Sequence, residues 1–157
     1  MEEQIFLTNI RQHNGIIIKV VNLYADELED RKDLYQEIIY QSWKASAGFR
    51  MEAKFSTWLY KISLNVSLTF LHKKKKHIKV TETITIDEYE PPIELSENAE
   101  RLYAAIKSLN EIERGLIMLH LEGYDNDTIS EIMGTTKNNT GVRLHRIKQK
   151  LTGILTK

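Results

Sequence analysis

Aromatic and basic side chains are concentrated in residues 49–76, where they could bind an unpaired strand of nucleic acid. Stacking on an aromatic ring is worth about 1–3 kcal/mol per base, and cationic side chains hold the backbone. The aromatic residues are Phe49, Phe55, Trp58 and Tyr60, and the basic ones are Arg50, Lys54, Lys61 and the lysines at 73–76. Core packing explains Trp58 as well as stacking does. For Leu59, Ile62 and Trp43, core packing is the interpretation we favour.

A second basic segment, residues 126–151, has the pattern of a helix-turn-helix. A short helix that opens at Asp125 or Asn126 is followed by Gly134, which suits a left-handed C-cap. Thr136 then suits the N-cap of a longer basic helix. One stripe of that helix is predicted to face inward, and it consists of Thr140, Leu144, Ile147 and Leu151.

The opposite side of this last helix carries side chains that could read base pairs in a major groove. Asparagine can bond adenine, arginine can bond guanine, and valine can touch the thymine methyl group. The face consists of Asn138, Val142, His145 and Gln149, with Gly141 and Arg146 beside it. Lys137, Arg143, Lys148 and Lys150 lie nearer the flanks and suit phosphate contacts. A protein-interaction bundle with the same helical pattern is the alternative.

Charge is strongly segregated, although the 22 basic and 22 acidic residues cancel. Counting Lys, Arg, Asp and Glu gives +7 for residues 50–79, −7 for residues 80–100 and +6 for residues 136–157. Two basic blocks separated by an acidic one could place two sites on a polyanion. Lysine clusters that only solvate a surface are the alternative.

The composition argues against several other classes of protein. The chain has no Cys, which excludes disulfides, a thiol nucleophile and a thiolate zinc site. No run approaches the ~18 apolar residues of a membrane helix, and the acidic N-terminus lacks the features of a secretory signal. No histidine pair has metal-site spacing and no glycine-rich phosphate loop is present. We therefore expect a cytoplasmic protein without membrane insertion, catalytic activity, metal or cofactor.

Apolar periodicity and scarce proline predict an all-α fold with two small domains: a helical domain at 1–77, an acidic flexible linker at 78–96 and a helix-turn-helix domain at 97–157. In the first domain we predict one helix over 5–23, a helix from Glu27 with a capping box of Asp26 and Glu29, and a helix capped by Ser56. In the second, Ser96 and Asn110 are the predicted caps, the latter paired with Glu113.

Several motifs together resemble the extracytoplasmic-function class of the sigma-70 family of RNA polymerase sigma factors. Residues 33–37 (DLYQE) and 55–62 (FSTWLYKI) resemble region 2 of that family. Residues 109–111 (LNE), 129–134 (ISEIMG) and 143–146 (RLHR) resemble region 4. The resemblance spans about residues 5–155, and the order of the two halves is that of the family.

The resemblance implies a role for each group of residues. Asp30, Asp33, Gln36 and Glu37, with Arg31 beside them, match the face that docks on the β′ clamp helices of core polymerase. Phe49, Arg50, Lys54, Phe55, Trp58, Lys61 and Asn65 match the surface that opens the downstream promoter element, with residues 47–54 as the base-capturing loop. Lys137, Asn138, Val142, Arg143, His145 and Arg146 match the contacts to the upstream element.

The resemblance also implies partners beyond promoter DNA. They are core RNA polymerase, including the β flap for region 4, and an anti-sigma factor, while the acidic linker would run through the polymerase channel. The main rival is an autonomous helix-turn-helix regulator, which would bind an operator tightly without polymerase. A helical adaptor without a nucleic-acid role is the second rival, and it would show no salt-dependent DNA binding.

Overall fold

The protein is described by a computed structural model that covers residues 1–50, 54–73, 89 and 95–157. Within these ranges every regular element is a helix, which confirms the predicted all-α fold. The chain divides into two compact units, Met1–Pro92 (unit 1) and Ile93–Lys157 (unit 2). The predicted linker boundaries stay predictions, because residues 74–88 and 90–94 lie outside the described part.

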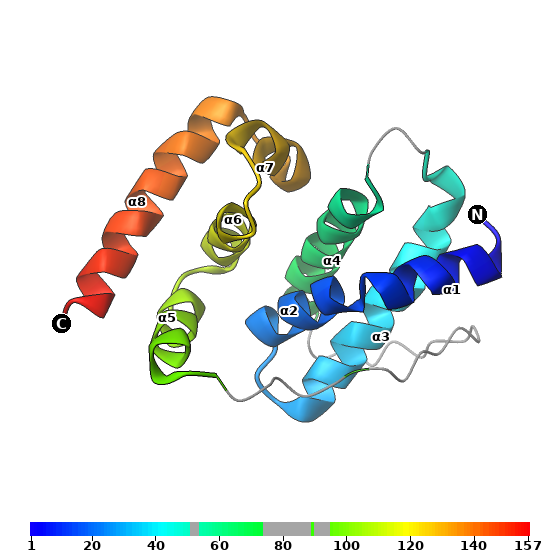
Figure 1. Ribbon diagram of the computed structural model, residues 1–157, viewed down its shortest axis with the longest axis horizontal. Coiled ribbons are helices and arrows are strands. Elements are labelled where there is room, and N and C mark those ends of the chain that lie inside the picture. The colour runs from blue at the N-terminus through cyan, green and yellow to red at the C-terminus, as the bar shows by residue number, and fades with distance from the viewer. Residues whose placement is uncertain (51–53, 74–88, 90–94) are drawn as a thin grey trace. The chain divides into compact units, whose positions relative to one another are not determined.

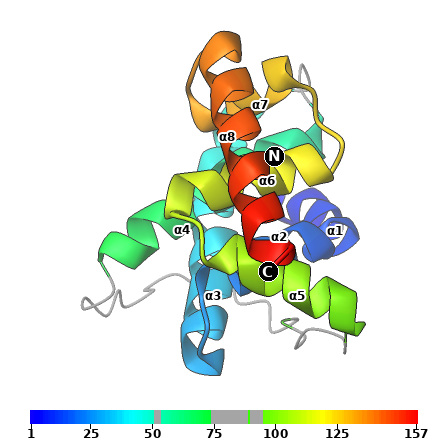
Figure 2. The same ribbon diagram turned by 90° about the vertical axis from the view of Figure 1, so that its left-hand side faces the viewer.

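Unit 1 is a helical bundle in which α4 packs against both α2 and α3 (Figures 1 and 2). Its elements are α1 (Glu3–Gln12), α2 (Asn14–Tyr24), α3 (Leu28–Ala45), the short turn η1 (Ser46–Gly48) and α4 (Phe55–His72). Burying a large apolar side chain contributes about 1.5–3 kcal/mol. The side chains that are at most 1% exposed include Phe6, Ile10, Ile17, Val20, Leu34, Tyr35, Ile38, Ile39, Leu59 and Leu64.

The predicted single helix over residues 5–23 is wrong, because the chain bends at His13 and forms α1 and α2. The His13 backbone N–H donates to the carbonyls of both Asn9 and Ile10, each at 3.1 Å, which closes α1. Tertiary packing accounts for the bend. The ring of Phe6 lies 5.1 Å from that of Trp43 near the end of α3, whereas α2 packs along α3 and α4. The bend lets both halves bury their apolar stripes.

The two caps predicted for unit 1 are also wrong. Helix α3 begins at Leu28 with Glu27 as its N-cap, and no side-chain cap hydrogen bond is formed there. Helix α4 begins at Phe55, one residue before Ser56, again without a side-chain cap in the described part. The ring of Phe55 packs on its aromatic neighbours at this point, so tertiary contacts rather than a local cap accompany the helix start.

Unit 2 contains α5 (Glu97–Lys107), α6 (Glu111–Leu121), α7 (Asn126–Met133) and α8 (Lys137–Leu155) (Figure 1). The predicted caps are confirmed: the side chains of Ser96, Asp125 and Thr136 each accept a backbone N–H three residues on. Asn110 and Glu113 form the predicted reciprocal capping box. Gly134 adopts the left-handed conformation, with φ of 70°, as its place after α7 predicts.

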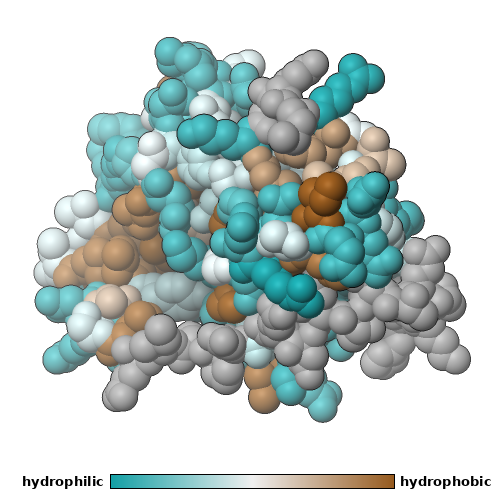
Figure 3. All heavy atoms as spheres, turned by 45° about the vertical axis from the view of Figure 1, so that its right-hand side comes forward, coloured by the Kyte–Doolittle hydropathy of each residue, from teal (hydrophilic) through white to brown (hydrophobic). Residues whose placement is uncertain are grey.

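The surface mixes apolar and polar groups. On the face in Figure 3, hydrophobic atoms form patches separated by hydrophilic side chains. The large apolar side chains that are more than 40% exposed in the described part are spread over several helices and the residues before α5, and they are Ile5, Leu28, Leu95, Ile112, Leu121, Val142 and Ile154. None of the described helices is long and apolar enough to span a bilayer.

Candidate nucleic-acid interfaces

The helix-turn-helix of unit 2 is built from α7 and α8. The inward stripe predicted for α8 is confirmed, since Thr140, Leu144, Ile147 and Leu151 are all buried. The hydroxyls of Ser130 on α7 and Thr140 on α8 lie 2.8 Å apart and are both buried. A hydrogen bond between two buried hydroxyls specifies one register between the helices. The direction in which α8 presents its outer side is therefore set by the core.

The six residues predicted to contact the upstream element share the outer side of α8. Asn126 of α7 and residues of α8 line a shallow hollow there, and the α8 members are Lys137, Asn138, Gly141, Val142, His145 and Arg146. Arg143 lies on the flank of the same helix, in a second hollow beside the start of α6. All six predicted residues are exposed, and Val142 exposes 43% of its surface. An exposed valine among polar groups suits contact with a thymine methyl group.

Glu113 has a second contact that sequence reasoning missed. Besides capping α6, its Oε2 lies 2.7 Å from Nζ of Lys150 on α8. Burial works against ionisation, but the Lys150 ammonium, the Asn110 backbone N–H and the nearby Arg143 guanidinium together hold the pKa of the carboxyl group below its usual value. Lys150, predicted to contact phosphate, therefore also ties α8 to α6. Its distance of 37 residues from Glu113 left no local signal.

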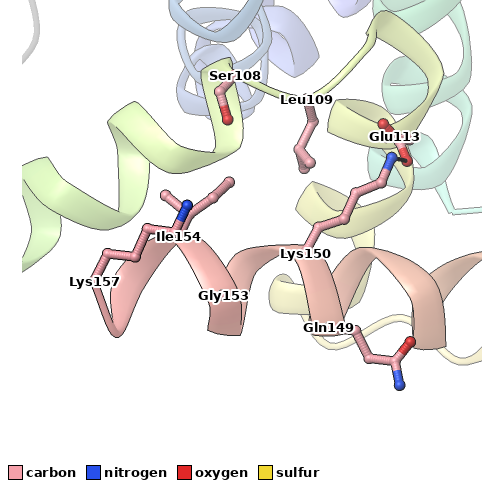
Figure 4. Close-up of a pocket in the computed structure, with 8 residues that line it drawn as sticks. All are labelled: Ser108, Leu109, Glu113, Gln149, Lys150, Gly153, Ile154 and Lys157. Carbon is pink, nitrogen blue, oxygen red and sulfur yellow. Dashed lines mark hydrogen bonds and ion pairs between the residues drawn. The ribbon is translucent and has the colours of Figure 1, made fainter.

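A groove lies at the C-terminal end of α8, where α5 joins α6 (Figure 4). Leu109 and Ile154 supply apolar surface, and Gly153 leaves open space above the helix, since a Cβ there would meet nothing within 4 Å. Lys157 lies at one end of the groove, and at the other end Lys150 reaches to the Glu113 carboxylate. This groove combines an apolar floor with the Glu113–Lys150 ion pair and the ammonium group of Lys157, and it is separate along α8 from the hollow of Asn138 and Val142.

Unit 1 brings four aromatic rings together at the start of α4. The ring of Phe55 lies 5.8 Å from that of Phe49 and 5.2 Å from that of Trp58, and Phe49 and Trp58 are 5.0 Å apart. The fourth member, His13, was not predicted, and its ring lies 5.0 Å from Phe55. All four side chains are half-buried. We call them the aromatic cluster.

The structure shows which of the aromatic and apolar residues near Trp58 lie in the core and which remain partly exposed. Trp58 packs on its neighbours and also keeps part of its ring accessible, so it is neither wholly core nor wholly surface. Tyr60 is only 2% exposed, so its assignment to the stacking residues is wrong: it points into the core beside Leu59. Ile62, expected in the core, is half-buried, as is Trp43, which packs on Phe6.

Basic and polar side chains near the aromatic cluster in the sequence are exposed. Lys61 and Asn65 are exposed on α4, four residues apart and therefore on one face of the helix. Arg50 and Lys54 are exposed on either side of residues 51–53. Lys73 is exposed after α4, and the predicted lysines at 74–76 lie outside the described residues. Exposed cations therefore flank the aromatic cluster along the chain at Arg50, Lys54 and Lys61, whereas Lys73 lies at the far end of α4.

The residues predicted to dock on polymerase lie along α3. Asp33 is exposed, Asp30 and Gln36 are half-buried, and Glu37 is only 8% exposed. The amide of Gln41 donates to Glu37 Oε1 at 2.8 Å, so this carboxylate is held within the helix surface. Arg31 donates from Nε to the Ala25 carbonyl at 2.8 Å. That bond ties the start of α3 to the end of α2.

Tyr89, which follows the helices of unit 1 in the acidic segment, packs on those helices. The hydroxyl of Tyr89 donates to Asn22 Oδ1 at 2.6 Å, and its ring lies edge-on to Tyr35 at 6.0 Å. Tyr35 in turn donates to Asn14 Oδ1. Tyr89 and Asn22 are 67 residues apart in the sequence, so no local pattern could predict their contact.

Metal ligands do not gather at these surfaces. In the ranges 1–50, 54–73, 89 and 95–157, no group of three or more His, Asp or Glu residues could hold a metal ion. The chemistry that the described side chains support is stacking, hydrogen bonding and ion pairing.

Both units match known protein families. Residues 10–77 match the family model of Sigma-70 region 2, and residues 99–151 match that of Sigma-70, region 4. The two family models cover most of the chain in the order of a sigma factor, and the chain belongs to the sigma-70 family. Within that family its relatives place it in the extracytoplasmic-function class. It directs core RNA polymerase to promoters and assists promoter melting in transcription initiation.

The relatives support this assignment along nearly the whole chain. RNA polymerase sigma factor SigV of Bacillus subtilis is 27% identical, with 92% of it and 98% of this chain covered. ECF RNA polymerase sigma factor SigM of Mycobacterium tuberculosis is 21% identical, with 74% of it and 92% of this chain covered. The sigma factor RpoE of Bartonella quintana, solved with the anti-sigma factor NepR, has the same fold, with a TM-score of 0.74, 16% identity and 96% of each chain covered.

Proposed function

We propose that unit 2 reads the upstream promoter element through the outer side of α8. The observation that carries this proposal is the shared exposure of Lys137, Asn138, Val142, Arg143, His145 and Arg146 over a helix anchored by the Ser130–Thr140 hydrogen bond. Asn138, His145 and Arg146 contact base edges in this arrangement, and Val142 contacts a methyl group. Lys137 and Arg143 contact phosphates on the flanks.

The aromatic cluster with Arg50, Lys54, Lys61 and Asn65 captures the opened strand. An enzyme or factor that holds a base outside the duplex must compensate for the cost of unstacking, which is a few kcal/mol. Partly exposed rings at Phe49, Phe55 and Trp58 supply stacking surface, while the exposed cations hold the backbone. Two sites on one chain then engage two parts of one promoter.

Core polymerase contacts both units in this proposal. The α3 face of Asp30, Asp33, Gln36 and Glu37 docks on the β′ clamp helices, with Asp33 as its exposed charge. The β flap contacts unit 2, and the groove between Leu109 and Ile154 offers an apolar floor for it. An anti-sigma factor also binds this chain, by analogy with the relative solved with NepR. The chain acts in the cytoplasm and has no catalytic activity of its own.

The decisive experiment is run-off transcription with purified core polymerase and genomic DNA. We expect initiation at discrete sites only when this chain is present. Binding of the holoenzyme to promoter DNA should weaken steeply as the salt concentration rises. Tight sequence-specific binding of the free chain, without polymerase, would instead support an autonomous regulator. Absence of initiation on every template would contradict the proposal.

Two variants separate the two DNA surfaces. Arg146→Ala removes a base contact and should weaken upstream binding of the holoenzyme by about 1–3 kcal/mol, while binding to a premelted downstream element that lacks the upstream element is unchanged. Trp58→Ala should leave upstream binding intact and reduce permanganate reactivity of the melted thymines, since about 1–3 kcal/mol of stacking is lost. Unchanged opening in the Trp58 variant would remove this residue from the melting surface.

A further inference from the structure

His13 stands where the bundle bends and where the aromatic cluster begins. It is the C-cap of α1 and the N-cap of α2. The residue is also half-buried, so it is not enclosed in the core of the bundle. The imidazole ring of His13 is therefore a polar member of the aromatic cluster, which we assign to strand capture.

The hydrogen bond of the imidazole determines which nitrogen is free. Nδ1 lies 2.8 Å from the backbone carbonyl oxygen of Asn9. A carbonyl oxygen only accepts, so Nδ1 donates and carries the proton of the neutral ring. Nε2 of the neutral ring then bears a lone pair and takes no part in the hydrogen bond to Asn9. The bend thus holds an acceptor in a fixed direction.

The packing of the ring joins this acceptor to the stacking surface. The His13 and Phe55 rings have centroids 5.0 Å apart and planes tilted by 49°. Phe55 in turn contacts both Phe49 and Trp58. Phe49 and Trp58 add ring faces and an indole N–H donor, whereas His13 adds a hydrogen-bond acceptor. A base stacked on these rings can be read at its edge from the His13 side.

We propose that His13 is a specificity-determining residue of the melting surface. Its Nε2 accepts a hydrogen bond from the exocyclic amino group of an unpaired adenine or cytosine of the opened strand. This inference rests on the proposed role of the aromatic cluster. It adds a contact from the bend between α1 and α2 to a surface otherwise formed by α4 and the residues before it.

A base-analogue cycle with the holoenzyme tests the contact. Forked DNA that carries the downstream element of a used promoter is prepared with each adenine replaced in turn by purine, and each cytosine by 2-pyrimidinone, which removes only the amino group. At one position the wild-type holoenzyme should lose roughly three- to tenfold in affinity. His13→Phe keeps an aromatic ring but no acceptor, so it should bind the natural and the amino-free DNA equally.

Gln12→Ala is the matched control, because Gln12 is the exposed neighbour at the end of α1. It should retain the full wild-type dependence on the amino group. A second measurement uses the wild-type chain, without any substitution. Diethylpyrocarbonate modifies accessible imidazole nitrogen atoms, and His13 should be protected from this reagent in the open complex with natural DNA. Protection should be lost on the amino-free DNA.

The outcomes distinguish this inference from the proposed function. Suppose that the wild-type holoenzyme opens promoters, but that removing any base amino group lowers its affinity no more than it lowers that of the His13→Phe holoenzyme. The role of His13 is then overturned, while strand capture stands. Equal modification of His13 in free and bound chains overturns it as well. If the wild-type holoenzyme opens no promoter, both proposals fail together.

Discussion

The two units begin their helices in different ways. All four helices of unit 2 have an N-cap side chain that accepts a backbone N–H, at Ser96, Asn110, Asp125 and Thr136. None of the described helices α1–α4 of unit 1 has such a bond. Unit 2 therefore encodes its helix ends locally, whereas unit 1 depends on contacts between helices. This difference agrees with the two proposed sites. In unit 2 a single capped helix, α8, carries the DNA contacts, whereas in unit 1 the aromatic cluster forms only where separate helices pack together.

The largest effect should come from the core of unit 1. Phe6→Ala removes a fully buried ring that joins α1 to Trp43, and it should destabilise unit 1 by about 3–5 kcal/mol. Both tryptophans of the chain, Trp43 and Trp58, lie in unit 1, so tryptophan fluorescence during urea unfolding reports this unit.

The control for the Phe6→Ala prediction is hydrogen exchange of unit 2 in the same variant. Hydrogen exchange of the amides in α8 should stay as in the wild type, because Phe6 belongs to unit 1. A loss below about 1 kcal/mol would mean that α1 contributes little to the unit, and it would weaken the contrast between packing and local caps.

A smaller effect should come from a cap of unit 2. Thr136→Ala removes the side chain that accepts the Asn139 N–H, and it should cost about 1 kcal/mol. Hydrogen exchange in the first turn of α8 should accelerate about fivefold.

Ser56→Ala in unit 1 is the matched control for Thr136→Ala. Ser56 looks like a cap in the sequence but lies inside α4, so its replacement should change stability by less than about 0.5 kcal/mol. Equal losses in the two variants would contradict the contrast between the units.

The smallest effect concerns the ion pair between Glu113 and Lys150. Because the pKa of Glu113 is lowered in the folded chain, its contribution is present above the usual carboxyl pKa and disappears as pH falls through the folded value. Pairs of this kind contribute below about 1 kcal/mol.

Lys150→Met should remove part of this pH dependence in acid titrations monitored by circular dichroism. Lys148→Met, on the same helix and exposed, should leave the titration unchanged. Identical acid transitions in the wild type and Lys150→Met would show that the pair contributes nothing to the stability of unit 2.

Local sequence determined much of unit 2 and the outline of both surfaces. Caps at Ser96, Asn110 and Thr136, and the turn at Gly134, act within a few residues, so their signals can be read from spacing alone. The inward stripe of α8 follows from helical periodicity for the same reason. The aromatic and basic residues around Trp58 were also visible as a cluster in the chain.

Only the tertiary structure decided the bend at His13, the burial of Tyr60 and the contacts of Tyr89 and Lys150. Each depends on side chains from separate helices or on residues far along the chain, which no local pattern encodes. The rings of His13 and Phe55 meet although one belongs to the bend after α1 and the other to the start of α4, which are far apart in the sequence. Burial of apolar surface is non-directional and sums over the whole unit, so its outcome emerges only when all the helices are packed together.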